Sequence, residues 1–177
     1  MNLGAENRSS PASWWRKPKL LSRLKRVEEV STSAGRAATS DDGEAMAKAR
    51  IGEDTREFFN VRVLDEAESY FYRLPVEYRH WLVEALVMRC IEMKDSDVTL
   101  VSDLFVRVRE KGLCGPDAFE EGFNRLAELV DDMAIGIPNA WSYFAILLKA
   151  AGLDQDEERR GRIAEKTQSP DKLIRIL

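Results

Sequence analysis

Adjacent carboxylates recur along the sequence, and four of these pairs are its first candidates for chemistry. The pairs are Asp41/Asp42, Glu120/Glu121, Asp131/Asp132 and Glu157/Glu158. A general acid and a general base must face the same substrate, whereas neighbouring residues on a helix point about 100° apart. Most of these pairs are therefore predicted to be solvated helix faces without a catalytic role.

The other groups that carry catalysis in proteins do not form a recognisable constellation. His80 is the only histidine, and it stands beside an apolar stripe with no serine or cysteine at a motif spacing. Cys90 and Cys114 are far apart and form no metal-binding spacing. Phosphate-binding, dinucleotide-binding, zinc-protease and calcium-loop motifs are absent from the sequence. We expect a non-enzymatic protein without cofactor or metal, and the cysteine usage indicates a reducing, cytoplasmic location.

The elements that position these groups are predicted to be helices, because apolar residues from Asp54 onward recur with a 3.6-residue period. No segment has a convincing strand pattern, so the fold class is all-α. Helices of this length joined by short turns stack as antiparallel pairs, with Phe123 and Trp141 in the core. The predicted helices span 54–59, 65–73, 77–93, 96–111, 117–131, 139–151, 154–166 and 169–177.

Several predicted helix boundaries coincide with residues that favour the start or the end of a helix. Asp95 or Ser96 is expected to cap the helix that starts near residue 96. Pro116 suits a first helical turn, and Gly112 and Gly152 suit the left-handed position that ends a helix.

The pair Asp131/Asp132 differs from the others because it lies where a helix is predicted to end. Acids in a last helical turn are repelled by the helix dipole, by about 0.3–1 kcal/mol at an exposed site. Pro138 follows and favours a turn, which would hold the acids at a loop corner, where binding residues often lie. Two interpretations remain: a solvated helix end closed by Gly136 with a positive φ, or a site whose charge a partner neutralises.

The first 52 residues differ in composition from the rest of the chain. Residues 1–50 contain ten basic and six acidic residues, a net charge of +4, whereas residues 51–177 carry −8. The segment STSAGRAATSDDGEA has almost nothing to bury, so residues 1–52 are predicted to be a disordered basic tail before a helical domain at 53–177. No apolar run is long enough to span a bilayer.

One stretch of the tail, WWRKPKLLSRLKR, combines aromatic, aliphatic and basic residues. Such a segment suits an RNA backbone, an acidic membrane face or a protein partner, although a solvated linker is the simpler interpretation. The candidate RNA-binding residues are Trp14, Trp15, Arg16, Lys17, Lys19, Arg23, Lys25 and Arg26.

Three stretches of the body resemble the MA3 domain family. EEGFNRLAELVDDMAIGIPNAWSYFAILLKAAGL (120–153) resembles its signature half, and LPVEYRHWLVEALVMRCIEMKDSDVTLVSDLF (74–105) its first half. EFFNVRVLDEAESYFYRLP (57–75) is similar to the segment leading into the C-terminal copy of initiation factor 4 gamma, and programmed cell death protein 4 carries the same domain. The resemblance covers about residues 54–166 and implies a stack of HEAT-like helical hairpins.

The resemblance also implies a function and a site. It implies a non-catalytic adaptor of translation initiation whose acidic inter-helix turns bind a DEAD-box RNA helicase, initiation factor 4A, or an inhibitor that sequesters this helicase. By the same resemblance, Asp132 matches the first acid presented to the helicase, Pro138 the proline opening the next helix, and Asn139 follows it at the predicted site. A second acid is common in the family where this chain has Gly136, and Asp131 lies on the other side of the turn.

Overall fold

A computed structural model describes residues 40–177, and all regular elements in this range are helical. The expected all-α fold is thus confirmed. The α-helices are α1 (Ser40–Val61), α2 (Leu64–Arg73), α3 (Arg79–Ile91), α4 (Asp95–Glu110), α5 (Pro116–Gly136), α6 (Ala140–Ala150), α7 (Glu157–Glu165) and α8 (Pro170–Ile176), and a short 3₁₀ helix, η2 (Val76–Tyr78), precedes α3.

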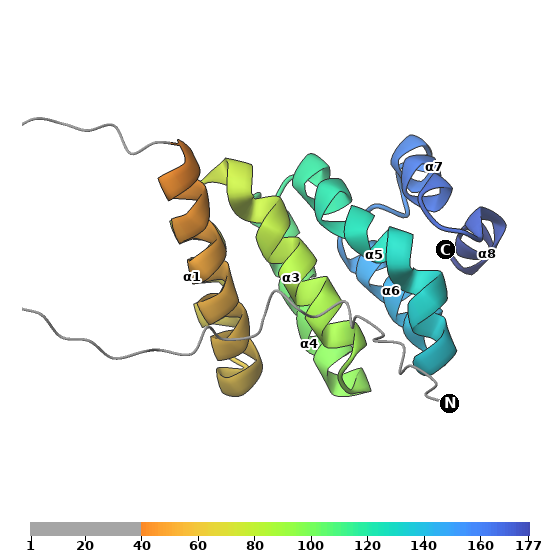
Figure 1. Cartoon of the computed structure of the whole chain (residues 1–177), viewed down its shortest axis with the longest axis horizontal. Coiled ribbons are helices and arrows are strands. Elements are labelled where there is room, and N and C mark those ends of the chain that lie inside the picture. The colour runs from red at the N-terminus through yellow and green to blue at the C-terminus, as the bar shows by residue number, and fades with distance from the viewer. Residues whose placement is uncertain (1–39) are drawn as a thin grey trace, which may run out of the picture. The chain divides into compact units, whose positions relative to one another are not determined.

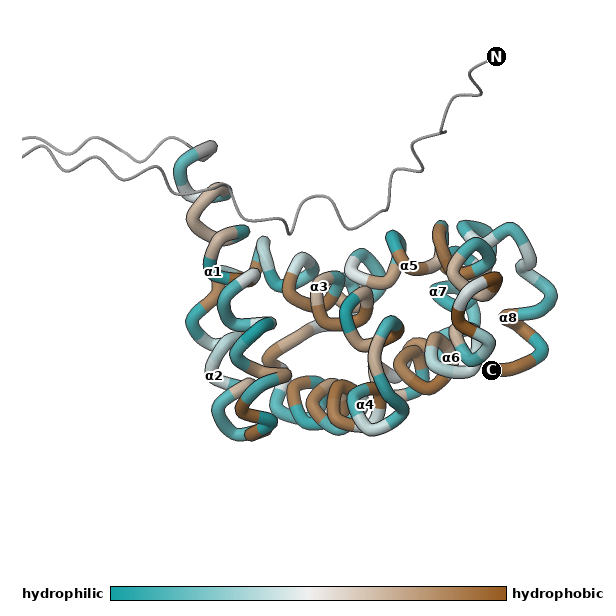
Figure 2. The backbone as a smooth tube through the Cα atoms, turned by 60° about the horizontal axis from the view of Figure 1, so that its bottom comes forward, coloured by the Kyte–Doolittle hydropathy of each residue, from teal (hydrophilic) through white to brown (hydrophobic). Residues whose placement is uncertain are grey.

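The helices form two layers. Helices α1, α3, α5 and α7 follow one another in one layer, and α2, α4 and α6 lie behind them (Figure 1). From α1 to α6, consecutive helices run in opposite directions, so α1–α2, α3–α4 and α5–α6 are antiparallel hairpins of the kind stacked in helical-repeat proteins. The apolar faces of the two layers meet between them, as Figure 2 shows. The largest fully buried side chains are Phe58, Phe71, Phe105, Phe119, Phe123, Phe144, Leu82, Leu86, Ile91, Leu104, Leu126 and Leu147.

Gly122 marks the point where α5 lies closest to α3. A Cβ at this position would lie 2.6 Å from Val83 Cβ and 2.8 Å from the backbone oxygen of His80. Real carbon atoms do not approach so closely, so only glycine lets the two helices pack at this distance. The next residue, Phe123, is fully buried and faces Phe105 and Phe144, with ring centroids 6.0 and 6.1 Å away. The core position predicted for Phe123 is thereby confirmed.

The first described helix begins earlier than predicted. Disorder was expected up to residue 52, but residues 40–52 belong to α1, so that prediction is wrong for this segment. The pattern was hard to recognise because each turn contributes little apolar area, chiefly from Ala47 and Ile51. These two residues continue toward the fully buried Phe58 at helical spacing, which gives α1 one buried face.

The expected helix boundaries agree with the structure at three glycine or proline positions. Gly112 and Gly152 have φ angles of 66° and 74°, and Pro116 is the first residue of α5. The expected cap of α4 is wrong, because Asp95 already lies inside the helix and Lys94 is the cap residue. The Asp97 carboxylate accepts a hydrogen bond from the Lys94 backbone N–H at 3.2 Å instead.

None of the helices at residues 40–177 is both long and apolar enough to cross a membrane. Over the same residues, no group of three or more His, Cys, Asp and Glu side chains is arranged to hold a metal ion.

Candidate partner-binding site at the α5–α6 turn

Helix α5 extends beyond the acidic pair that was predicted to end it. It runs to Gly136, and the Ile137 N–H still donates to the Met133 carbonyl at 2.8 Å. Asp131 and Asp132 therefore lie before the last turn, and the expected helix-end location is wrong. Gly136 does not take a left-handed φ; it is a helical residue, and a Cβ there would have open space within 4 Å. The left-handed closure proposed for Gly136 is likewise wrong.

Asp131 is engaged by the chain itself. Its carboxylate accepts a hydrogen bond from the Gln168 backbone N–H at 2.9 Å and one from the Ser169 hydroxyl at 2.8 Å. Both donors lie in the turn between α7 and α8, so Asp131 ties this turn to α5. Since the donors lie 37 and 38 residues further along the chain, no local sequence signal could have found this contact.

Asp132 is different, although it is the next residue. Its side chain is exposed, and no hydrogen bond or ion pair to it occurs among residues 40–177. Ile135, one turn further along, is 87% exposed, the highest value among the exposed large apolar side chains of the described residues. An exposed carboxylate beside an exposed apolar side chain suits a partner that offers Lys or Arg together with apolar surface.

The turn after α5 is built around Pro138 and Asn139, both exposed. The Ala140 N–H closes it by donating to the Ile137 carbonyl at 3.0 Å, and α6 begins at Ala140. The Asn139 side chain donates to the Tyr143 hydroxyl at 3.4 Å, and this hydroxyl donates to the Asp95 carboxylate. The bond to Asp95 raises the pKa of Tyr143 above its ordinary value. The turn is thereby fixed to the start of α4.

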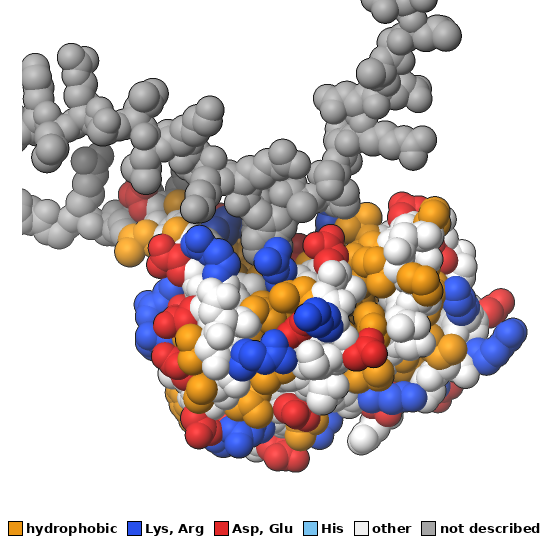
Figure 3. All heavy atoms as spheres, turned by 90° about the horizontal axis from the view of Figure 1, so that it is seen from below, with side chains coloured by type: hydrophobic (Ala, Val, Ile, Leu, Met, Phe, Trp, Pro, Cys, Tyr) orange, Lys and Arg blue, Asp and Glu red, His pale blue; other side chains and the backbone are white. Residues whose placement is uncertain are grey.

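The turn that precedes α4 is also fixed to its neighbour. Arg62, which follows α1 with a φ of 61°, pairs with the Asp97 carboxylate and donates to the Ser96 carbonyl at 3.2 Å. Burial alone would raise the pKa of Asp97, but the hydrogen bonds from Arg62 and the Lys94 backbone N–H lower it overall. The α1–α2, α3–α4 and α5–α6 turns thus form one linked edge, seen from below in Figure 3.

This edge, here called the turn edge, carries charges of both signs with apolar side chains between them (Figure 3). It is not a uniform acidic patch. A partner would therefore recognise individual contacts such as Asp132 rather than a general negative field.

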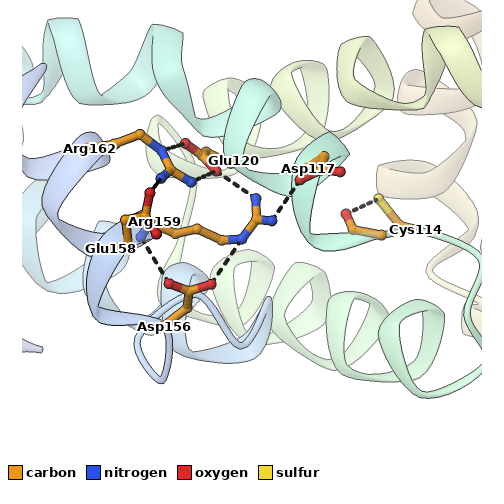
Figure 4. Close-up of polar contacts among 8 residues, drawn as sticks. Cys114, Asp117, Glu120, Asp156, Glu158, Arg159 and Arg162 are labelled. Carbon is orange, nitrogen blue, oxygen red and sulfur yellow. Dashed lines mark hydrogen bonds and ion pairs between the residues drawn. The ribbon is translucent and has the colours of Figure 1, made fainter.

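A second acidic cluster, at the other end of α5, shows what a structural carboxylate looks like here. Glu120 accepts hydrogen bonds from Arg162 at 2.6 and 2.9 Å and from Arg159 at 2.7 Å (Figure 4). Arg159 also pairs with Asp117 at 2.7 Å and Asp156 at 3.1 Å. Hydrogen bonds from Arg162, and then from Arg159, lower the pKa of Glu120 despite its partial burial. This cluster holds α7 against α5, and Glu120 at its centre is fully engaged by the two arginines.

The remaining candidate residues are placed as follows. His80 is half-buried, with Nε2 3.5 Å from Glu121 Oε1, and no nucleophile approaches it among the contacts of the described chain. Both cysteines are buried and free, and burial raises their pKa values, that of Cys114 to about 12, which disfavours the reactive thiolate. The candidate RNA-binding residues of the tail, from Trp14 to Arg26, lie outside the described residues.

The architecture is a stack of antiparallel helical hairpins. The MA3 domain family model matches residues 53–154, more than half of the chain. The chain belongs to the MA3 domain family, whose members are helical protein-interaction modules. Comparison with curated proteins and with solved structures gives no match. Helices α7 and α8 lie beyond the matched range.

Proposed function

We propose that this chain is a non-catalytic adaptor of translation initiation that binds a DEAD-box RNA helicase, initiation factor 4A, through the turn edge. Membership of the MA3 family supports an interaction role, and the resemblance to the copies in initiation factor 4 gamma and programmed cell death protein 4 suggests the partner. The observation that carries the proposal is the exposed Asp132 carboxylate, which has no partner among residues 40–177.

Asp132 is the main charged contact in this proposal. A carboxylate that accepts a hydrogen bond from Arg or Lys contributes about 1.5–3 kcal/mol to binding. Asp131 does not supply a second contact, because Gln168 and Ser169 already occupy it. Gly136 replaces the second acid common in the family, so affinity should be roughly one to two orders of magnitude below that of a two-acid relative.

Isothermal titration calorimetry tests this proposal. The purified full-length chain is titrated with initiation factor 4A at low and at physiological salt. We expect micromolar binding that Asp132→Lys weakens at least about tenfold, since it replaces attraction with repulsion. Gly136→Glu should strengthen binding by about the value of one charge-assisted contact, because a side chain at this helical position has open space.

Glu110→Lys is the matched control. Glu110 is also an exposed acid near a helix end without a partner in the described chain, but it ends α4 on the edge opposite the turn edge. This variant carries the same change in charge and should bind like the wild type. Equal weakening by both variants would indicate a non-specific charge effect, and absence of wild-type binding would contradict the proposal.

The alternative function, RNA binding through the basic tail, makes a separate prediction. It requires affinity that falls steeply with salt and disappears when the tail is removed. Because α1 begins at Ser40, the deletion should remove residues 1–39 and leave the helix intact. Whether a bound helicase is activated or sequestered is then read from its unwinding rate in the presence of the chain.

A further inference from the structure

The turn between α7 and α8 contains the sequence Ser169-Pro170-Asp171-Lys172. Proline has no backbone N–H, so a kinase can bind it directly after the modified serine without offering a hydrogen-bond acceptor there. A basic residue two positions after the proline adds an ionic contact with the kinase. The other Ser-Pro pair in the chain, Ser10-Pro11, is followed by Ala12 and Ser13 and lacks this basic residue. The turn therefore has the sequence chemistry of a proline-directed kinase substrate.

The Ser169 hydroxyl occupies a position where added negative charge would matter. It donates to Asp131 Oδ1 at 2.8 Å, while the Gln168 N–H donates to the other oxygen at 2.9 Å. A phosphorylated serine carries a charge of about −1.5 to −2 near neutral pH and no longer has a hydroxyl proton to donate. Phosphate at this atom would replace a hydrogen bond with repulsion from the carboxylate.

Helix α8 is attached to the rest of the domain by few contacts. It has seven residues, and Leu173 is its only buried side chain. Lys149 Nζ donates to the Ile176 carbonyl at 3.2 Å, and Lys172 Nζ lies 4.6 Å from the centre of the Trp141 ring. Elements held by so little buried surface open locally without global unfolding, which gives a kinase access to the half-buried Ser169.

We propose that Ser169 is a phosphorylation site for a proline-directed serine/threonine kinase and that the phosphate releases the α7–α8 turn from α5 and thereby detaches α8 from α6. The kinase transfers the γ-phosphoryl group of ATP to Ser169 Oγ. The bond from the γ-phosphorus to the β–γ bridging oxygen breaks, an Oγ–P bond forms, ADP leaves, and the hydroxyl proton passes to a base of the kinase. This inference does not depend on the proposed helicase partner.

The charges around Ser169 favour the detached form after modification. Asp131 repels the phosphate, and the nearest cation along α8, Lys172, is placed over the Trp141 ring. If the phosphate attracts Lys172, the contact with Trp141 is lost, and this also loosens α8. Detachment frees the Asp131 carboxylate beside the exposed Asp132 on α5.

The test treats the full-length chain with ATP and a purified cyclin-dependent kinase, followed by peptide mass spectrometry and hydrogen exchange. We expect phosphate on Ser169, and none at this position in Ser169→Ala or Pro170→Ala. Amides of residues 171–177 should exchange about tenfold faster in the phosphorylated chain, the factor expected when one ordinary hydrogen bond is lost. In Asp131→Asn the same phosphate should accelerate exchange much less, because the repelling charge is gone.

A synthetic peptide of residues 163–177 controls for sequence recognition and for access. Failure of the kinase to modify this peptide, or modification of the peptide but not of the folded chain, would overturn the proposed site. Phosphate on Ser169 with unchanged exchange of α8 would overturn the detachment, as would an equal acceleration in Asp131→Asn.

Discussion

The two halves of α5 use the same residue types for opposite purposes. In the first half, Gly122 has no room for a side chain and Glu120 is held by two arginines. In the second half, Gly136 has open space around it and Asp132 has no partner in the described chain. Neither a glycine nor an acid therefore identifies a site by itself. What distinguishes the two halves is whether the protein's own side chains satisfy and enclose these residues.

The largest expected effect is at Gly122. In Gly122→Ala the new Cβ would overlap with Val83 and the His80 backbone, and a backbone atom cannot move aside without shifting α3. We expect a loss of about 3 kcal/mol in the free energy of unfolding, which is at the upper end of the cost of overpacking a core. The higher helix propensity of alanine offsets only part of this cost. Urea unfolding measures the change, and a stability equal to the wild type would show that α3 and α5 are not so closely packed.

The next effect concerns the structural acid. Glu120→Ala leaves Arg159 and Arg162 without their shared carboxylate, and we expect a loss of about 2 kcal/mol, since charge-assisted bonds contribute about 1.5–3 kcal/mol. Glu121→Ala is the matched control: the neighbouring side chain is exposed and should change stability by less than about 0.5 kcal/mol. Thermal melts of the two variants, measured side by side, test this difference in stability, and equal melting temperatures would contradict it.

Low pH should weaken the contacts between α5 and α7, because it protonates Glu120. The pKa of Glu120 is lower in the folded chain than its ordinary value near 4.5. Its stabilising contribution is therefore complete above pH 4.5 and is lost as the pH falls through the folded pKa. The melting temperature of the wild type should fall more between pH 5 and pH 3 than that of Glu120→Gln. Parallel curves would exclude Glu120 as a source of the acid sensitivity.

The smallest effect is a gain at Gly136. Because this residue is helical and unobstructed, Gly136→Ala should stabilise the chain by about 0.5 kcal/mol, less than the full difference between the two residues because the position ends the helix. Gly112→Ala, at a φ of 66°, should instead destabilise it by about 1 kcal/mol. Destabilisation by both substitutions, measured in urea, would contradict the helical conformation of Gly136.

The sequence predicted the helices where apolar residues recur at helical spacing, and the left-handed glycines at positions 112 and 152. It misplaced the end of α5 because Gly136 and Pro138 resemble the residues that end a helix, whereas the structure continues the backbone hydrogen bonds to Ile137. The start of α1 was missed because Ala47 and Ile51 provide too weak a stripe.

The candidate site was less predictable than the fold, because contacts between residues distant in sequence decide which of its carboxylates are available to a partner. The residues around Asp131 give no sign that Ser169 donates a hydrogen bond to it, and those around Glu120 give no sign of its hydrogen bond from Arg159. Local pattern therefore treats Asp131 and Asp132 as equivalent, and only the tertiary structure separates an engaged acid from an exposed one.

The layered packing has a consequence for how unfolding should be observed. Each helix contacts its hairpin partner and the helices two places before or after it, as in α1·α3, α3·α5 and α5·α7. In such a one-dimensional array, stability is the sum of the hairpins and their interfaces, and terminal units fray before central ones. Spectroscopic probes at the two ends of the stack need not report the same transition midpoint. A single midpoint from one probe would then conceal a loss of two-state cooperativity.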